Sequence, residues 1–350
     1  MKKKIIAVLV FTLFCNFISQ AQKPVSDFNP CGTVSPSDEW NRWFSEKVQE
    51  FKRTQSDKRS PLVNYKIPII IHILHDGDPI GANENISLAQ AHSQIPLLNA
   101  DFSGTNCDIS QVPEEFLSAL AHDTGIQFCL ASHDTNGNLL PELGIERINW
   151  KKKANWIDPS SFGNKDQLKA HFDNTIKKAS IWDPDRYLNV WLAIIDGSGI
   201  GGYATFPENS LNFSDVENEF TSGVVINQRM WGNIGTVPTG YSPLQPSNDY
   251  GRVATHEIGH YLGLLHTFEG GCFGILNCDD FGDRCCDTPL TSYDDWKCPS
   301  GTKNTCLLSA GNDMTMNYMS YTDDYCKYMF TNDQVARIQT AMANGTIGKT

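Results

Sequence analysis

The chain has 350 residues, of which 28 are Lys or Arg and 40 are Asp or Glu, giving a formal net charge of −12 at pH 7. This acidic balance argues against a nucleic-acid-binding surface, because phosphate binding depends on clustered lysine and arginine side chains. The length is sufficient for one globular unit with a sizeable core, preceded by shorter processing segments.

Residues 1–21 have the pattern of a secretory signal peptide. Three lysines follow Met1, an apolar run extends from Ile5 to Ile18, and Ala21 supplies the small residue of a cleavage site. The apolar run is too short to cross a membrane, and no later stretch approaches the roughly 18 to 20 residues that a span needs. The sequence therefore predicts a protein without a membrane span, exported to an extracellular or periplasmic space.

Residues 22–60 are predicted to form a pro-segment. Trp40, Phe44, Val48 and Phe51 recur at helical spacing, which indicates a helix with one apolar face. A polar stretch follows and ends near Lys58 and Arg59, where cleavage would release a mature enzyme. Basic residues at this junction would suit a peptidase selective for them, so self-processing is a hypothesis.

The predicted mature chain alternates apolar strands with helices. Continuous apolar runs at residues 67–74 and 187–195 indicate buried strands, and residues 87–102 have the spacing of a helix. Two further strands are predicted at residues 202–206 and 223–227, before the next helix.

Residues 255–266 place three imidazoles and one carboxylate where a catalytic zinc needs them. On a helix, His256 and His260 leave the same face and can bind one metal ion, while Glu257 stays free for a water. Gly263 ends the helix, because glycine accepts a positive φ, and the resulting turn brings His266 back to the metal. The alternative is two exposed polar histidines on an amphipathic helix.

The local pattern around this motif supports a helix. Residues 247–249 (Ser-Asn-Asp) are candidates for its N-cap. A buried stripe on the face opposite the histidines comprises Ala254, Ile258, Tyr261, Leu262 and Leu265.

The motif predicts hydrolysis of an amide bond. Three neutral histidines leave one coordination position of zinc open for a water, and Glu257 can take the proton of that water. Glu257 can then return the proton to the leaving amine. The extended signature, followed by a methionine turn, is that of metzincin peptidases.

Three segments carry a closer resemblance. The zinc motif continues into residues 266–272 (His-Thr-Phe-Glu-Gly-Gly-Cys), followed by 282–289 (Gly-Asp-Arg-Cys-Cys-Asp-Thr-Pro) and by Asn317-Tyr318-Met319 with Tyr321 and Cys326. Together they resemble the pappalysin family of metzincins, and in particular its bacterial members. The resemblance extends from about Ile67 to Met342 and is dense only after Arg252.

The resemblance implies roles for three residues of the last segment. Met319 matches the methionine that forms a hydrophobic floor beneath the metal, and Tyr321 matches a tyrosine that hydrogen-bonds the tetrahedral intermediate. Plain core packing is the alternative for both. Asp324 matches the carboxylate that selects Arg or Lys just after the scissile bond, by charge-assisted pairing. Its alternatives are a surface acid, or an assignment shifted to Asp323.

An acidic loop follows the zinc motif and, by the resemblance, binds structural calcium, which prefers several oxygen ligands. A solvated acidic loop is the alternative. The candidate ligands are Asp279, Asp283, Asp287 and Thr288.

Ten of the eleven cysteines remain once Cys15 leaves with the signal peptide, and seven of them lie after the zinc helix. An oxidising compartment favours disulfides there, although their connectivity does not follow from sequence. The resemblance suggests two bridges in this region, with Cys326 joined to a cysteine near Cys298. Cys107 with Cys129 is a candidate separate pair.

Cys31 lies in the predicted pro-segment, within residues 29–33 (Asn-Pro-Cys-Gly-Thr). A thiolate can occupy the open position of zinc and displace the catalytic water, which would make the chain a cysteine-switch zymogen. Pappalysin precursors resemble such a zymogen. An ordinary disulfide is the alternative, and the odd number of cysteines left after Cys31 slightly favours it.

The resemblance implies an α+β or α/β metzincin fold in residues 61–350. We expect a twisted mixed sheet, backing helices and the active-site helix in residues 61–263, and an irregular, disulfide-rich subdomain in residues 264–350. An edge strand within residues 201–206 would pair with extended substrate.

The predicted function is that of a secreted zinc endopeptidase, made as a zymogen and acting as a monomer on proteins or peptides, with Arg or Lys after the scissile bond. The alternatives are a zinc hydrolase of other amides and an inactive, metal-stabilised binding module. The intact Glu257 argues against the second alternative, because a structural zinc needs no general base.

Overall fold

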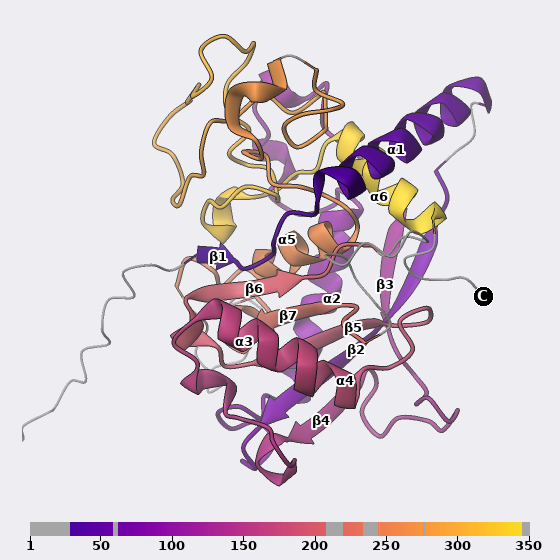
Figure 1. Cartoon of the computed structure of the whole chain (residues 1–350), viewed down its shortest axis with the longest axis vertical. Coiled ribbons are helices and arrows are strands. Elements are labelled where there is room, and N and C mark those ends of the chain that lie inside the picture. The colour runs from indigo at the N-terminus through magenta and orange to yellow at the C-terminus, as the bar shows by residue number, and fades with distance from the viewer. Residues whose placement is uncertain are drawn as a thin grey trace, which may run out of the picture.

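The apolar run predicted as a strand at residues 67–74 forms the central strand β2 (Tyr65–His75) of a mixed sheet (Figure 1). A computed structural model describes residues 29–58, 62–207, 220–233, 244, 246–275 and 277–344, so the predicted signal peptide and Arg59 lie outside the described residues. Within these ranges the sheet has seven strands in the order β1-β6-β7-β5-β2-β3, and β4 also pairs with β2. The remaining strands are β1 (Asn29–Cys31), β3 (Ile126–Leu130), β4 (Ile145–Asn149), β5 (Leu188–Ala193), β6 (Ile200–Ala204) and β7 (Val224–Asn227).

The strand directions confirm a mixed sheet. β2 runs parallel to β3, β4 and β5, whereas β6 runs antiparallel to β7. The strands predicted at residues 187–195, 202–206 and 223–227 correspond to β5, β6 and β7. No sequence pattern predicted β1, β3 and β4. These strands have only three to five residues, and β3 and β4 are partly exposed, so they lack a continuous apolar run.

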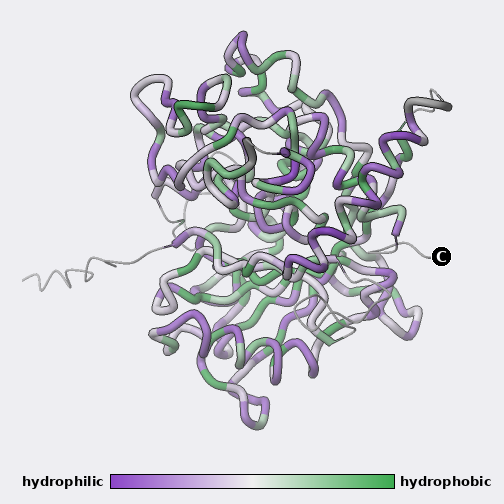
Figure 2. The backbone as a smooth tube through the Cα atoms, turned by 45° about the horizontal axis from the view of Figure 1, so that its top comes forward, coloured by the Kyte–Doolittle hydropathy of each residue, from purple (hydrophilic) through white to green (hydrophobic). Residues whose placement is uncertain are grey.

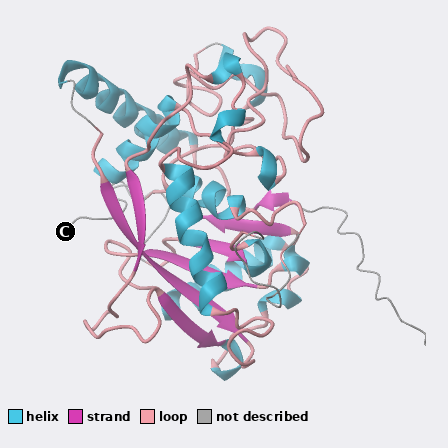
Figure 3. Cartoon of the chain, turned by 180° about the vertical axis from the view of Figure 1, so that it is seen from behind, coloured by secondary structure: helices cyan, strands magenta, loops and turns pink. Residues whose placement is uncertain are grey.

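Each face of the sheet packs against its own helices. Ile69, Ile71 and Ile73 of β2 belong to the core cluster beneath α2 (Leu88–Phe102) and α5 (Arg252–Tyr261), and Figure 3 shows α2 crossing this face. Trp191 and Val225 point to the opposite face, where α3 (Lys165–His171) and α4 (Lys177–Ser180) lie. Figure 2 shows hydrophobic and hydrophilic stretches alternating along the chain, with many of the hydrophobic ones in the interior.

Short helical turns connect these elements. A π-helical turn at Phe172–Ile176 joins α3 to α4. None of the described helices combines the length and the apolar composition that a membrane span requires. The 3-10 turns lie at Ile109–Gln111, Glu114–Phe116, Trp150–Lys152, Pro159–Ser161, Asp196–Ser198, Gln228–Met230, Gly271–Ile275 and Asp324–Cys326.

The region after α5 is irregular up to α6 (Asn332–Ala343), as predicted for a disulfide-rich subdomain. Three disulfides cross-link it, one more than the two suggested by the resemblance. They join Cys272 to Cys306, Cys278 to Cys286, and Cys298 to Cys326, so the expected partner of Cys326 is confirmed. Such bridges limit the freedom of a long loop that has little regular structure of its own.

The predicted pair of Cys107 and Cys129 is wrong, because both cysteines are free. The loop that carries Cys107 is held against the C-terminal region by the Asn106 amide, which donates to the Tyr328 carbonyl over 3.1 Å. Cys129 lies on β3, where it pairs in register with Pro68 of β2.

The predicted pro-segment helix is α1 (Asp38–Lys58), which packs against α6. Its apolar face buries Trp40, Phe44 and Val48 against Phe206 and Leu265, the latter just past the zinc motif helix. Helix α1 therefore packs both on α6 and on the chain that follows α5.

Candidate active site

The zinc motif lies on α5, whose N-terminus differs from the prediction. Arg252 is the first helical residue and follows Gly251, which has a φ of 73° and no capping side chain. The backbone N–H of Arg252 donates instead to Oδ2 of Asp324 over 2.9 Å. The prediction of an N-cap within residues 247–249 is therefore wrong, because a carboxylate distant in sequence binds this orphan amide.

The end of α5 agrees with the prediction. Gly263 has a φ of 88°, and the turn that it makes carries the chain back toward the helix. A Cβ on Gly263 would lie 2.7 Å from Cζ of Phe44, so α1 of the pro-segment also requires glycine here.

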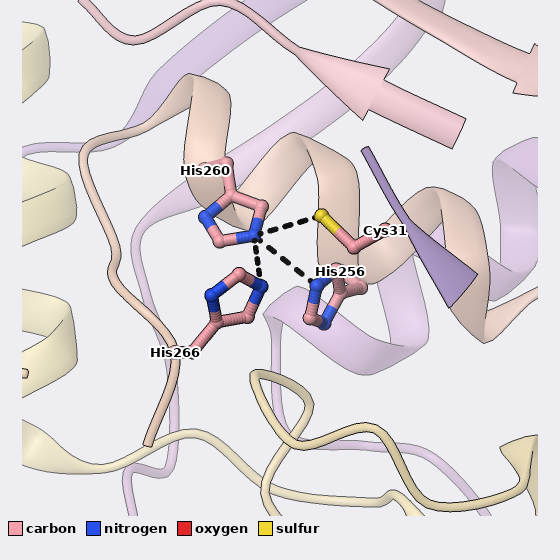
Figure 4. A group of neighbouring side chains, drawn as sticks. All are labelled: Cys31, His256, His260 and His266. Atoms are coloured by element: carbon pink, nitrogen blue, oxygen red, sulfur yellow. Dashed lines mark hydrogen bonds between the residues drawn. The ribbon is translucent and has the colours of Figure 1, made fainter. Parts of the chain in front are cut away.

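This turn brings three imidazoles together (Figure 4). Nε2 of His260 lies 3.1 Å from Nε2 of His256 and 3.0 Å from Nε2 of His266. The Nδ1 atoms of His256 and His260 contact the carbonyls of Tyr318 and Leu264 at 2.7 and 2.8 Å, which assigns the ring proton to Nδ1. The Nε2 lone pairs therefore converge on one point.

This arrangement fits a cation. Burial and the neighbouring imidazoles lower the pKa of His256 and His260 well below the ordinary value, so both rings are neutral. Neutral acceptor nitrogens about 3 Å apart have no proton to share, and a metal ion is the natural partner of such a set. The carbonyl contacts at Nδ1 are of the kind that orients metal-binding histidines.

Cys31 completes this cluster. Its sulfur lies 3.5 Å from Nε2 of His260 and 3.6 Å from Oε2 of Glu257, and its side chain is buried and free of any disulfide. The possible ligand atoms of Cys31 and the three histidines all lie within 4.8 Å of one another. Burial also raises the pKa of the thiol. Nitrogen and sulfur donors in this number match the preferences of zinc.

The strand that carries Cys31 occupies the edge of the sheet. β1 runs parallel to β6, with Cys31 opposite Gly202. The N–H of Gly32 donates to the Gly202 carbonyl over 2.7 Å, and Nζ of Lys169 donates to the Gly32 carbonyl over 2.9 Å. The edge predicted to pair with substrate is therefore taken by β1, which lies in the predicted pro-segment.

Glu257 also contacts a residue of the predicted pro-segment. The Thr33 hydroxyl donates to Oε2 of Glu257 over 2.7 Å and accepts from the N–H of Ala204 over 2.9 Å. The other oxygen, Oε1, has no hydrogen-bond partner among the described residues. Burial raises the pKa of Glu257 to about 8. The carboxyl is thus withdrawn from solvent and held by a residue that the sequence analysis missed.

Met319 packs against α5, and Tyr321 lies beside the imidazoles. A Cβ on Gly259, the residue before His260, would lie 2.5 Å from the Met319 sulfur. The Tyr321 ring centroid is 4.8 Å from that of His266. Burial and the Cys31 thiol raise the pKa of Tyr321, so its hydroxyl stays protonated.

Comparisons with known proteins agree with this geometry. The sequence profile of a peptidase family described as pregnancy-associated plasma protein-A matches residues 171–343. An extracellular metalloprotease of Verticillium alfalfae is 28% identical over 312 residues, 89% of this chain and 87% of that protein. A promirolysin mutant of Tannerella forsythia is 28% identical, with a TM-score of 0.66, over 91% of this chain and 95% of the other. Mature mirolysin of the same organism, in complex with a cleaved peptide, is 30% identical, with a TM-score of 0.60, over 79% of this chain and 91% of the other.

The chain belongs to the pappalysin family of metzincin metallopeptidases. It is a metalloendopeptidase; the family implies a zinc cofactor, and a histidine-rich site is present among the described residues.

Asp324 lies at the first turn of the pappalysin zinc helix and is fully buried. Besides accepting from Arg252, its carboxylate lies 3.3 Å from Nζ of Lys327, which is also buried. Its own N–H donates to the Ser247 carbonyl over 2.9 Å. The predicted specificity residue therefore already has an internal cationic partner.

The four predicted calcium ligands mostly contact other residues and not one another. The Thr288 hydroxyl donates to Asp283 over 2.7 Å, and burial raises the pKa of Asp283 to about 7. Asp287 accepts from the N–H of Asp333 over 2.9 Å. Asp279 accepts from Gln49 of α1 over 2.6 Å. Only Asp283 and Thr288 are in direct contact with each other.

Four residues around the site escaped the sequence analysis: Thr33, Lys169, Asp101 and Arg252. Thr33 follows Cys31 by two residues, and alternation along a strand would have placed both side chains on the same side. Nothing in the local sequence pointed to Lys169 or Asp101, because their partners are more than 100 residues away.

Proposed function

We propose that the chain is the latent precursor of a secreted zinc endopeptidase, with His256, His260 and His266 as zinc ligands, Glu257 as general base and Cys31 as the switch. The observation that carries this proposal is the convergence of one thiol and three Nε2 atoms within 4.8 Å, with Glu257 beside them. When bound, zinc supplies a Lewis acid for the scissile carbonyl and acidifies a water.

The residues of this chain then handle the proton and the developing charge. Glu257, once Thr33 has left, has both carboxylate oxygens free to take a proton from the attacking water and to return it to the leaving amine. Tyr321 keeps its proton and lies against the ligand His266, where its hydroxyl can donate to an oxyanion.

Substrate binding follows from the sheet edge. Edge strands carry unpaired backbone groups and pair readily with an extended chain. Here β1 takes these groups on β6, including the Gly202 carbonyl. We infer that an extended peptide replaces β1 after activation, in keeping with the cleaved peptide present in the mature mirolysin structure.

The processing segments are part of the proposal: a signal peptide at residues 1–21, a pro-segment at 22–60 and a catalytic domain at 61–350, divided after Gly263. Two observations support the pro-segment. Residues 29–58 cover the candidate active site through β1 and α1. The match to promirolysin also covers 91% of this chain, against 79% for the mature enzyme.

Specificity is assigned to Asp324, whose buried carboxylate would pair with Arg or Lys after the scissile bond. The ion pair with Lys327 supports this role, since the Asp324 carboxylate already pairs with one cation there. A substrate side chain has to compete with that internal partner. If Asp323, and not Asp324, controls the preference for Arg or Lys, the assignment moves by one residue.

Calcium binding at the acidic loop is proposed as structural. A buried carboxyl at Asp283 in contact with the Thr288 hydroxyl, with Asp287 close in sequence, offers oxygen ligands of the kind that calcium prefers. The proposed ligands remain Asp279, Asp283, Asp287 and Thr288.

We further propose that the enzyme acts as a monomer, because the candidate ligands, base and switch all come from one chain. Light scattering on the purified protein would test this, and a stable dimer would contradict it.

A digest of a peptide library tests the enzymatic proposal. The activated protein is expected to cleave internal peptide bonds, to lose activity with a zinc chelator and to recover it with added zinc. Glu257→Ala should be inactive and should fail to process its own precursor. Zinc-loaded, activated protein that leaves every peptide intact would overturn the proposal in favour of a hydrolase of other amides or a binding module.

A further inference from the structure

Asp101, on the last turn of α2, lies directly behind the zinc helix. We propose that it is a positioning residue that fixes the orientation of His256, and therefore determines how firmly the site retains its metal. The inference rests on the proposed function, in which His256 is a zinc ligand. No sequence motif pointed to Asp101.

Two hydroxyls donate to this carboxylate. The Thr255 hydroxyl donates to Oδ2 over 2.7 Å, and the Tyr318 hydroxyl donates to Oδ1 over 2.9 Å. All three residues are buried, so these bonds form away from solvent. Hydrogen bonds to a buried charged acceptor are among the strong ones in proteins.

Both donor residues adjoin His256. Thr255 is its neighbour on α5. Tyr318 contacts it across the site, because the Tyr318 carbonyl lies 2.7 Å from Nδ1 of His256. Asp101 thus holds the Tyr318 side chain, and the backbone oxygen of Tyr318 orients the His256 imidazole. Outer contacts of this kind set the ring orientation of a metal-binding histidine.

Arg252 keeps the carboxylate in place and charged. Its Nε lies 3.0 Å from Oδ2 of Asp101, its Nη atoms contact Asp108 at 3.1 Å, and its side chain lies over the Tyr318 ring at 5.3 Å. The same residue begins α5 by donating its N–H to Asp324. The end of α2, the start of α5 and the methionine turn therefore meet at one ion pair.

The test compares Asp101→Asn and Tyr318→Phe with wild type. Tyr318→Phe removes one hydroxyl and keeps the ring, so it is the variant expected to fold even where changes at Asp101 do not. Glu146→Gln is the control: Glu146 also accepts from two side-chain donors, the rings of His72 at 2.7 Å and Trp182 at 3.2 Å, but lies on β4.

The readouts are the rate of zinc release to a colorimetric chelator, the melting temperature, and kcat and KM on a quenched peptide. We expect zinc release to quicken by about 10- to 100-fold in Asp101→Asn and by a smaller factor in Tyr318→Phe. We expect kcat to fall with little change in KM. The double variant should lose less kcat than the two single losses added together, since both changes remove the same Asp101–Tyr318 contact.

Glu146→Gln is expected to lower the melting temperature without quickening zinc release. Wild-type zinc release and kcat in both Asp101→Asn and Tyr318→Phe would overturn the proposal and leave Asp101 a purely structural residue. A failure of the proposed function looks different: the wild-type protein itself would then retain no zinc or cleave no peptide.

Discussion

The hydroxyl of Thr33 donates a 2.7 Å hydrogen bond to Oε2 of Glu257, from a pro-segment residue to the proposed general base. Two residues earlier, the Cys31 sulfur lies 3.5 Å from Nε2 of His260. The pro-segment therefore engages both halves of the proposed machinery, the metal ligands through a thiol and the base through a hydroxyl.

Removing these contacts should weaken latency to different extents. We expect the Cys31→Ala precursor to show basal peptidase activity and to process itself. Thr33→Val keeps the branched shape and removes only the donor, so it should raise basal activity less, on the order of tenfold, as suits one hydrogen bond to a charged group. Initial rates on a quenched peptide measure both effects. A Cys31→Ala precursor as silent as wild type would contradict the switch.

Glu257→Gln should abolish turnover while sparing the fold. The amide has nearly the same shape, accepts from Thr33 and cannot take a proton from water. We expect kcat/KM of the activated enzyme to fall by about 10²- to 10⁴-fold. Zinc content should match that of wild type, and residual activity within a few-fold of wild type would exclude Glu257 as the base.

Gly259 should be intolerant of a side chain because Met319 lies beneath it. A Cβ at Gly259 would come within 2.5 Å of the Met319 sulfur, so Gly259→Ala is expected to destabilise the protein by about 1 to 3 kcal/mol. Gly163→Ala is the matched control, since nothing lies within 4 Å of its added Cβ. Denaturant unfolding measures both. Equal stability of the two variants would argue against close packing at the methionine turn.

Asp324→Asn should relax the preference for basic residues while preserving the helix start. An asparagine oxygen can still accept from the N–H of Arg252, but the negative charge is gone. In a peptide library we expect the ratio of kcat/KM for arginine over norleucine after the scissile bond to drop by at least tenfold. Asp323→Asn serves as the control. If only the control variant loses selectivity, the assignment moves to Asp323.

Stability should depend on pH and calcium through Asp283. Burial raises its folded pKa to about 7, above the unfolded value near 4, so its contribution is present at low pH and is lost as pH rises from about 4 to about 7. Bound calcium favours the ionised carboxylate and should offset this loss above neutrality. Melting temperatures with and without a calcium chelator, for wild type and Asp283→Asn, measure this stabilisation by calcium. A calcium response that Asp283→Asn leaves intact would place the ion elsewhere.

The parts of the fold that follow from sequence are those set by local pattern. β2 was predictable because its residues are apolar almost throughout, and α2 because Ser87 caps a periodic segment by accepting from the N–H of Gln90. The zinc motif was predictable for the same reason, since spacing alone brings His256 and His260 to one face of a helix.

The parts that did not follow depend on partners distant in the chain. The cap of α5 comes from Asp324, 72 residues after Arg252, and no local signal identifies it. Thr33 and Asp101 gain their roles only when the pro-segment and α2 are docked against α5. The predicted number of disulfides was also wrong, because pairing depends on where the folded loops place each thiol.

X-ray absorption at the zinc edge of the intact, zinc-loaded precursor would show whether Cys31 binds the metal. We expect one sulfur at about 2.3 Å and three nitrogens at about 2.0 Å, with the sulfur lost in Cys31→Ala and after activation. A wild-type precursor whose zinc has only nitrogen and oxygen neighbours would contradict it.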